Sequence, residues 1–224
     1  MQSFVERLLV HTQNIIPMTS RKYLLLILIL IIYPFDSWAN SNMLENWTLV
    51  HEHDGMSVYS RSTDLSDIKE IRVSFTVASS MNKIIALLAD VPRYKNWVYK
   101  CSYSERVKTI NENEFYYYTV SDFPIPFEDR DLVIKSKHWL DNETGIYYSQ
   151  SEAVDEIIDK KNGLVRIPSF SSTWTIKPLE TQLIQIEYQV ISSAGGLIPS
   201  WLVNLAIAKG PLETMVAFKA LVLL

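Results

Sequence analysis

The stretch Ile184–Val190 reads IQIEYQV, and it is followed by Gly195-Gly196 and by a long segment, Pro199–Leu224. Apolar and polar side chains alternate in the first stretch, which predicts a β-strand with one buried face. The last segment has the apolar pattern of a helix, and we expect Gly210-Pro211 either to break this helix or to set a helix start. A strand with a face to bury, followed by a helix that can cover it, favours an α+β fold.

Upstream of this strand, the same alternation recurs along the chain. Asp54-Gly55 lies between two alternating runs and predicts a hairpin. One helix interrupts the strands: Ser79 or Ser80 is its expected N-cap, and its apolar stripe begins at Met81. Consecutive strands with short links predict one antiparallel sheet with the terminal helix on one face. The expected strands are 47–53, 56–60, 69–77, 102–109, 114–120, 130–138, 146–153, 164–167, 172–177 and 184–190.

Composition excludes several classes of protein. The 224 residues carry 21 basic and 25 acidic side chains, a net charge of −4, without a basic cluster, so we expect no binding to nucleic acid. The single cysteine, Cys101, rules out an intramolecular disulfide and an unaided cysteine-based zinc or iron–sulfur site. The histidines show no HExxH spacing, and His51 and His53, which share a strand face, are expected on an exposed polar face, with a metal clamp as the weaker alternative. No cofactor is implied.

The first 39 residues have the layout of an N-terminal extension and a signal peptide. Met18 is the expected start, Arg21 and Lys22 supply the positive region, and an apolar run follows. Ser37-Trp38-Ala39 places small residues where a signal peptidase cleaves, so cleavage is expected after Ala39. An uncleaved segment that anchors the chain is the alternative. We therefore expect a secreted or periplasmic protein whose single domain spans residues 40–224.

Four motifs in sequence order carry a family resemblance. They are Tyr94-Lys95-Asn96-Trp97, FPIPFEDRDLV at 123–133, LVRIPSFSSTWTIKP at 164–178, and GGLIPSWLVN at 195–204. Together they resemble the START domain, the steroidogenic acute regulatory protein-related lipid transfer family, in a bacterial secreted-type member. The resemblance implies a helix-grip fold, also shared by Bet v 1-like allergens: a curved antiparallel sheet wrapped around the C-terminal helix, enclosing an apolar cavity for one lipid.

Under this resemblance, one charged side chain and several large apolar ones are candidate ligand contacts. Ordinary core packing is the alternative for each aromatic residue. The predicted ligand-binding residues are Arg130, Trp97, Tyr118, Trp174, Ile134, Tyr188 and Trp201.

Arg130 is the most informative of these residues. In a strand it shares a face with Leu132 and Ile134, whereas Asp131 lies on a more charged face that should meet water. An inward guanidinium needs a partner, either a polar group of the ligand or an acidic side chain such as Glu128, Asp131 or Glu152. Arg166 is out of phase with its apolar neighbours and is expected to be exposed.

The sequence favours a carrier over an enzyme, because no nucleophile–base or metal pattern is found. We expect non-catalytic binding, and possible transfer, of one lipid or sterol-like molecule. Exposed apolar residues on Gly196–Leu202 would make transient membrane contact during loading. Two alternatives stay open: a cyclase/aromatase-type enzyme on the same fold, with His138 as a candidate base, and an interaction protein whose cavity is filled.

Overall fold

The computed structural model describes residues 46–223, apart from 65, 156 and 181. The expected extension, signal peptide and cleavage point after Ala39 lie outside the described residues. The expected single domain, residues 40–224, is described from Asn46 onward, and the fold below refers to this unit alone.

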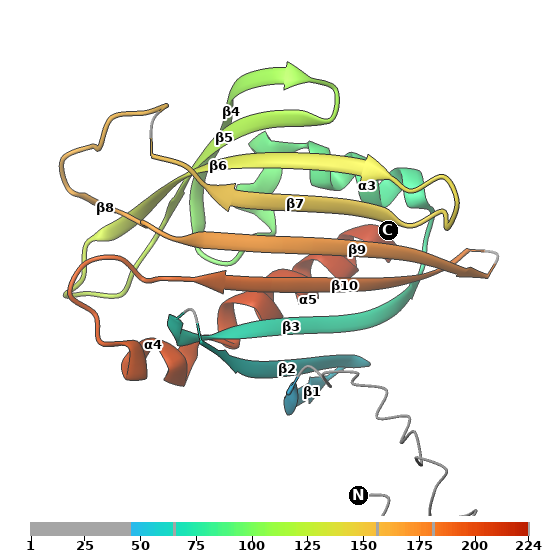
Figure 1. Cartoon of the computed structure of the whole chain (residues 1–224), viewed down its shortest axis with the longest axis horizontal. Coiled ribbons are helices and arrows are strands. Elements are labelled where there is room, and N and C mark those ends of the chain that lie inside the picture. The colour runs from blue at the N-terminus through green and yellow to red at the C-terminus, as the bar shows by residue number, and fades with distance from the viewer. Residues whose placement is uncertain (1–45, 65, 156, 181, 224) are drawn as a thin grey trace, which may run out of the picture. The chain divides into compact units, whose positions relative to one another are not determined.

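Within the described part of the chain, ten strands form one sheet, with helices between β3 and β4 and after β10 (Figure 1). Every strand lies within a few residues of its expected position. The strands are β1 (Thr48–His53), β2 (Met56–Thr63), β3 (Ser66–Ala78), β4 (Cys101–Asn111), β5 (Glu114–Ser121), β6 (Asp129–Leu140), β7 (Tyr147–Ala153), β8 (Leu164–Arg166), β9 (Phe170–Glu180) and β10 (Leu183–Ser192). The helices are α3 (Met81–Ala89), the 3-10 helix η1 (Val91–Asn96), α4 (Ser200–Ala206) and α5 (Lys209–Leu223).

The sheet is curved, and its strands follow the order β1-β2-β3-β10-β9-β7-β6-β5-β4. After β3 the chain crosses through α3 and η1 to the far edge, then returns strand by strand until β10 pairs with β3. All these neighbours are antiparallel, as expected, whereas the short β8 pairs with β6 in parallel. The predicted α+β helix-grip fold is therefore confirmed.

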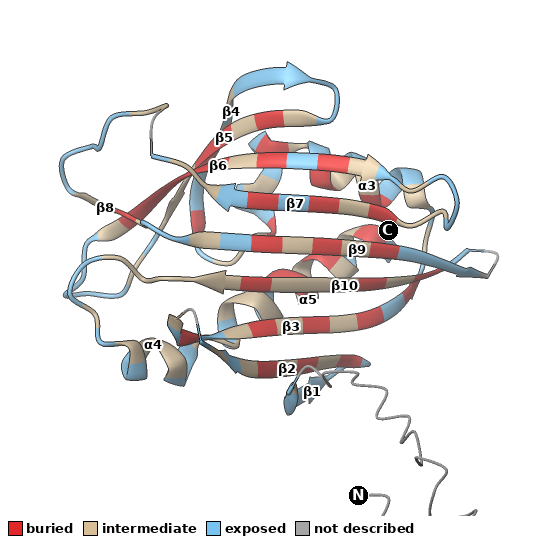
Figure 2. Ribbon diagram, in the orientation of Figure 1, coloured by how far each residue is buried: buried red, intermediate tan, exposed pale blue. Residues whose placement is uncertain are grey.

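The helices α3 and α5 cover the same face of the sheet, which lies in front of them in Figure 1. Side chains along β3 alternate between buried and less buried positions, as Figure 2 shows for most strands. On the buried face, Phe75 joins a core with Ile84 of α3 and Met215 and Phe218 of α5. The alternation seen in the sequence thus selects the face that the helices cover.

Two local signals in the sequence fold as expected. Asp54 and Gly55 have φ angles of 46° and 71°, the left-handed conformation that a tight hairpin between β1 and β2 requires. Ser80 is the N-cap of α3, where its hydroxyl accepts a hydrogen bond from the Lys83 amide.

The C-terminal helical segment is interrupted earlier than at Gly210-Pro211. The break falls at Ile207-Ala208, between α4 and α5. Gly210 and Pro211 lie in the first turn of α5, where a missing N–H leaves no helical hydrogen bond unmade. Of the two expectations for this dipeptide, it is the helix start that the structure adopts.

Candidate ligand-binding cavity

A cavity of about 290 Å³ lies between the inner face of the sheet and the C-terminal helical segment. Its described wall is built from β5, β6, β7, β9 and β10, from residues 94–101, and from the first turns of α5, together with Leu88, Ile167 and Ile207. The volume is near the lower end of the range for small-molecule sites, which is about 300–1,000 Å³. The expected hollow interior is therefore present.

Large aromatic side chains form one part of this wall. The Trp174 ring lies 4.6 Å from that of Tyr188 and 6.3 Å from that of Trp97, measured between centroids. Phe218 of α5 packs against both tryptophans, at 5.2 and 4.9 Å. These inclined contacts are the favourable geometry for aromatic pairs, so they hold the rings of β9, β10 and the segment after η1 against α5.

Small hydroxyl side chains form another part of the wall. In β7, Ser149 and Ser151 occupy the inward positions between Tyr147 and Ala153, and both are buried. Among the described residues that line the cavity, none has an Asp, Glu, Lys, Arg or His side chain. The serines that line it are Ser121, Ser136, Ser149, Ser151, Ser172 and Ser192.

Four titratable groups in this wall have pKa values that burial raises, which keeps them neutral at physiological pH. Burial raises the pKa of the phenols of Tyr94, Tyr117 and Tyr188 well above the ordinary value. Burial also raises the pKa of the Cys101 thiol. The described wall thus offers a ligand apolar surface and uncharged hydrogen-bonding groups.

Four of the seven predicted ligand-binding residues are brought together here. Trp97, Ile134, Trp174 and Tyr188 all line the cavity. Their contact with a ligand stays a prediction, and the other three predicted residues, Arg130, Tyr118 and Trp201, lie outside the lining.

Arg130 is buried, with 3% of its surface exposed, but it is held by backbone carbonyls and not by an acidic side chain. Its guanidinium donates to the carbonyl oxygens of Ala194, Gly195 and Glu128 and lies 4.1 Å from the centre of the Phe123 ring. Of the two partners that the sequence left open, the acidic side chain is therefore wrong, and backbone carbonyls engage all three guanidinium nitrogens.

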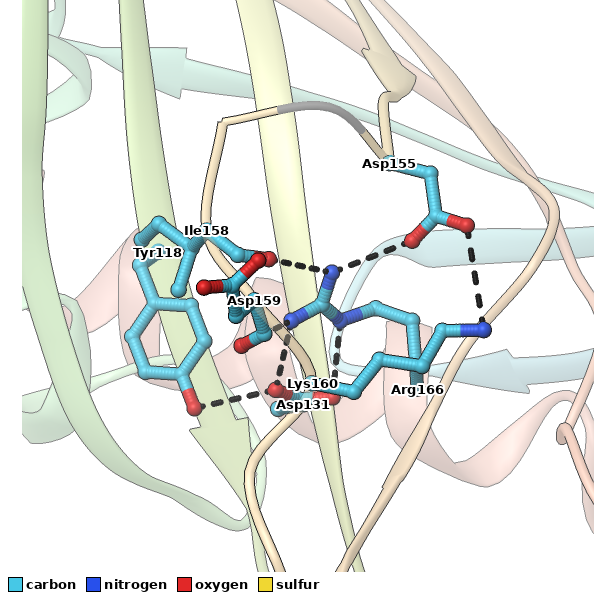
Figure 3. A network of polar contacts seen from close by, with 7 residues as sticks. All are labelled: Tyr118, Asp131, Asp155, Ile158, Asp159, Lys160 and Arg166. Atoms are coloured by element: carbon cyan, nitrogen blue, oxygen red, sulfur yellow. Dashed lines mark hydrogen bonds and ion pairs between the residues drawn. The ribbon is translucent and has the colours of Figure 1, made fainter.

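Tyr118 faces away from the cavity, and its neighbour Tyr117 takes the inward position. On the outer face of the sheet, the Tyr118 hydroxyl donates a hydrogen bond to the Asp131 carboxylate, which is 3.1 Å away (Figure 3). Three consecutive tyrosines in β5 give no alternation from which the inward one can be chosen. Tyr118 is therefore corrected from a cavity residue to a residue of the outer face.

Asp131 and Arg166 were expected to meet water, and the structure corrects both. The Arg166 guanidinium binds both oxygens of the Asp131 carboxylate, at 2.9 and 3.0 Å. The loop before β8 covers the pair, and Asp155 of this loop also binds Arg166 (Figure 3). The two side chains are 1% and 3% exposed, because parallel pairing of β8 with β6 brings together residues that are far apart in sequence.

Trp201 lies in α4, where 65% of its surface is exposed. None of the seven residues of α4 is buried. This aromatic side chain lines no part of the cavity, so its position fits an external contact and not the predicted internal one.

Sequence reasoning missed the serines and Tyr117 as wall residues. The signal that would have found Ser149 and Ser151 is their shared phase with Tyr147 in β7. Ser136 likewise shares the phase of Leu132 and Ile134 in β6.

Neither a metal site nor a membrane-spanning helix is found in the described residues. No group of three or more His, Cys, Asp or Glu side chains there is placed to hold a metal ion. No helix of the same residues is long and apolar enough to cross a membrane.

A curved sheet that wraps around a terminal helix, with a cavity between the two, defines a class of proteins that bind ligands in their interior. The START domain family model matches residues 40–222, most of the chain, and the protein belongs to this family. Membership implies binding of a lipid or another hydrophobic ligand.

Three known proteins show how similar the chain is to others. PA1579 of Pseudomonas aeruginosa is 29% identical over 179 residues, which cover 79% of this chain and 87% of that protein. The rat (Rattus norvegicus) phosphatidylcholine transfer protein is 28% identical over 174 residues, 74% of this chain and 78% of its own. The crystal structure of a STAR-related lipid transfer protein fragment from Xanthomonas axonopodis superposes with a TM-score of 0.74 at 28% identity, covering 80% of this chain and 99% of that one.

Proposed function

We propose that this protein binds one hydrophobic molecule in the cavity beneath α5 and carries it between membranes without a chemical step. The observation that carries the proposal is the cavity itself, lined by rings and neutral hydroxyls in a member of the START family. A carrier must replace the membrane environment of its cargo, because each exposed methylene costs about 0.8 kcal/mol in water. The aromatic part of the wall supplies that environment.

The titration behaviour of the wall supports a carrier over an enzyme. General acid–base catalysis works best with a group whose pKa lies near the working pH. The buried tyrosines and Cys101 have pKa values raised above their ordinary range. His138, the candidate base, is not among the described lining residues, and its two ring nitrogens contact Ser136 and Tyr147.

The test is to purify the protein from cells expressing the full chain, measure its intact mass by native mass spectrometry, and extract it with organic solvent. We expect one hydrophobic molecule per protein, identified in the extract by mass spectrometry. A well-folded protein that carries no such molecule, and takes none up from liposomes, would contradict the proposal.

We propose further that α4 and the loops beside it touch a membrane while cargo enters or leaves. One of these loops, residues 193–199, joins β10 to α4, and the other, residues 122–128, joins β5 to β6. Arg130 links the two loops, because it donates hydrogen bonds to Ala194 and Gly195 in the first and lies over the Phe123 ring in the second. Ile125 and Leu197 on these loops are almost fully exposed, as is much of Trp201. Large apolar side chains exposed on segments that one arginine links are candidates for a membrane contact.

Flotation with liposomes tests this contact. Leu197→Asp is expected to weaken flotation, whereas Leu140→Asp should leave it unchanged. Leu140 is half exposed at the other end of β6 from Arg130, so it is a matched apolar control. Equal flotation of the two variants, or no flotation of the natural protein, would count against a membrane contact here.

We also propose that the protein works in the periplasm or outside the cell after cleavage behind Ala39. The support is the positive pair Arg21 and Lys22 ahead of an apolar run. N-terminal sequencing of the protein from fractionated cells should begin at Asn40. A cytoplasmic protein that retains residues 18–39 would contradict this.

A further inference from the structure

The described cavity wall is rich in hydroxyl groups, although the proposed ligand is hydrophobic. Of its 25 lining residues, six are serines, two are threonines and four are tyrosines. A hydroxyl group both donates and accepts hydrogen bonds and can rotate to suit either role. Hydrocarbon alone makes no use of such groups, so their number points to polar atoms in the ligand.

Three of the serines form a row across neighbouring strands. Ser151 of β7 is the register partner of Ser136 in β6 and of Ser172 in β9. The Oγ atoms of Ser136 and Ser151 are 2.9 Å apart. All three side chains are buried, so we call Ser136, Ser151 and Ser172 the serine row of the wall.

The side chains behind the row are also uncharged. The Ser136 hydroxyl lies 3.0 Å from Nε2 of His138, and the Tyr147 hydroxyl lies 2.8 Å from Nδ1 of the same ring. Burial lowers the pKa of His138 to about 4, so the imidazole is neutral under physiological conditions. The row and its support are thus a chain of neutral donors and acceptors.

No arginine lines the described cavity wall, so none places its charge against the serine row. Arg130 lies six residues from Ser136 along β6, about 20 Å away in an extended strand. Arg106, whose charge acts on His138, is exposed and donates to the Ala89 carbonyl. The three guanidinium nitrogens of Arg130 donate to backbone carbonyls. Arg166 is paired with Asp131 on the outer face of the sheet. An ionised phosphate or carboxylate placed against the serine row would therefore be desolvated without a counter-charge among the described lining residues, which strongly disfavours its binding.

We propose that the bound molecule is an uncharged lipid that carries oxygen, such as a long-chain alcohol, ester or ketone, with its oxygen against the serine row. The inference rests on the proposed carrier function and narrows its ligand class. The aromatic rings take the hydrocarbon part, and the row takes the neutral oxygen. A lipid whose charged group must enter the cavity is disfavoured.

A matched set of ligands separates the effect of charge on binding from the effect of chain length. Hexadecanol, methyl hexadecanoate, hexadecanoate and hexadecane are each used to displace a fluorescent apolar probe from the purified protein, at a pH where the free acid is ionised. We expect the alcohol and the ester to bind at least about tenfold more tightly than the carboxylate, since each 1.4 kcal/mol is a factor of ten. Lowering the pH should strengthen binding of the acid as it becomes neutral.

A second comparison tests the serine row itself. Ser151→Ala should weaken binding of the alcohol and the ester by about three- to tenfold relative to hexadecane, because a hydrogen-bonding partner is lost. Ser171→Ala, on an exposed position of β9, should change neither, and thermal unfolding confirms that both variants fold.

The outcomes are distinguishable. Carboxylate that binds as tightly as the ester, or hexadecane that binds as tightly as the alcohol, would overturn this inference and leave a carrier of hydrophobic molecules intact. If none of the four ligands displaces the probe and the protein carries no lipid from cells, the proposed function fails, and the inference fails with it.

Discussion

Asp131 and Leu132 are neighbours in β6, yet they face two buried regions of opposite character. On the outer face, Asp131 is paired with Arg166 and enclosed by the loop before β8. On the inner face, Leu132 lines a cavity whose described wall has no charged side chain. The same strand therefore separates a fully compensated ion pair from a neutral chamber.

The difference teaches where this fold places its charges. An ion pair inside the cavity would compete with an apolar ligand for the wall and would have to be desolvated on loading. On the outer face, the pair joins β6 to β8 and to the covering loop without touching the ligand site (Figure 3). The charged pair stabilises the outer face of the wall, and uncharged groups line its inner face.

The largest expected effect comes from breaking the outer pair. Arg166→Met leaves the Asp131 carboxylate buried without its cation, which should lower the free energy of unfolding by about 3–5 kcal/mol. Chemical denaturation measures the change. The exposed Arg93, which pairs with Asp90 at the surface, is the control, and its change to Met should alter stability by less than about 1 kcal/mol.

A double variant sharpens this result. Asp131→Leu combined with Arg166→Met removes both charges, so most of the lost stability should return. If the single and double variants are equally unstable, the loss does not come from an uncompensated charge, and our account of the outer face is wrong.

The inner face should respond to pH through His138. Its pKa is about 4 in the folded protein against 6.5 ordinarily, so the unfolded chain takes up the proton first as the pH falls. Between about pH 6.5 and pH 4 this difference should lower the free energy of unfolding by a total of about 3 kcal/mol. In His138→Phe this part of the pH dependence is absent, as denaturation at a series of pH values would show. A variant whose pH dependence matches that of the natural protein would contradict a neutral, buried His138.

The smallest expected effect is on the serine row. Ser136→Ala removes the hydroxyl that contacts Ser151 and His138, and it should lower the free energy of unfolding by about 1 kcal/mol. Ser171→Ala, on an exposed position, should cost less than about 0.5 kcal/mol. A loss as large as that of Arg166→Met would mean that the inner and outer faces do not differ as we describe.

Much of the fold could be predicted because its signals are local. The alternation in 184–190, the turn at Asp54-Gly55 and the cap at Ser80 each follow from a few neighbouring residues. The alternation in β6 also places Leu132 and Ile134 in the cavity wall. Four motifs in order then identified the family.

The rest depended on contacts between distant parts of the chain. Burial of Asp131 needs β8 and its preceding loop, about 35 residues further on, and no periodicity within β6 shows this partner. Tyr117 and Tyr118 differ only in which face the register gives them. Arg130 has an inward position, but the backbone carbonyls that hold it come from the segment after β10 as well as from its own loop.

The most direct test of the central claim is to fill the cavity and measure the ligand content of the protein. Ser172→Phe places a ring inside the wall, whereas Ser171→Phe places the same ring on the exposed position beside it. Mass spectrometry of organic extracts should find one hydrophobic molecule per protein for the natural chain and for Ser171→Phe, and little or none for a folded Ser172→Phe. Undiminished ligand in folded Ser172→Phe would show that the molecule is held elsewhere.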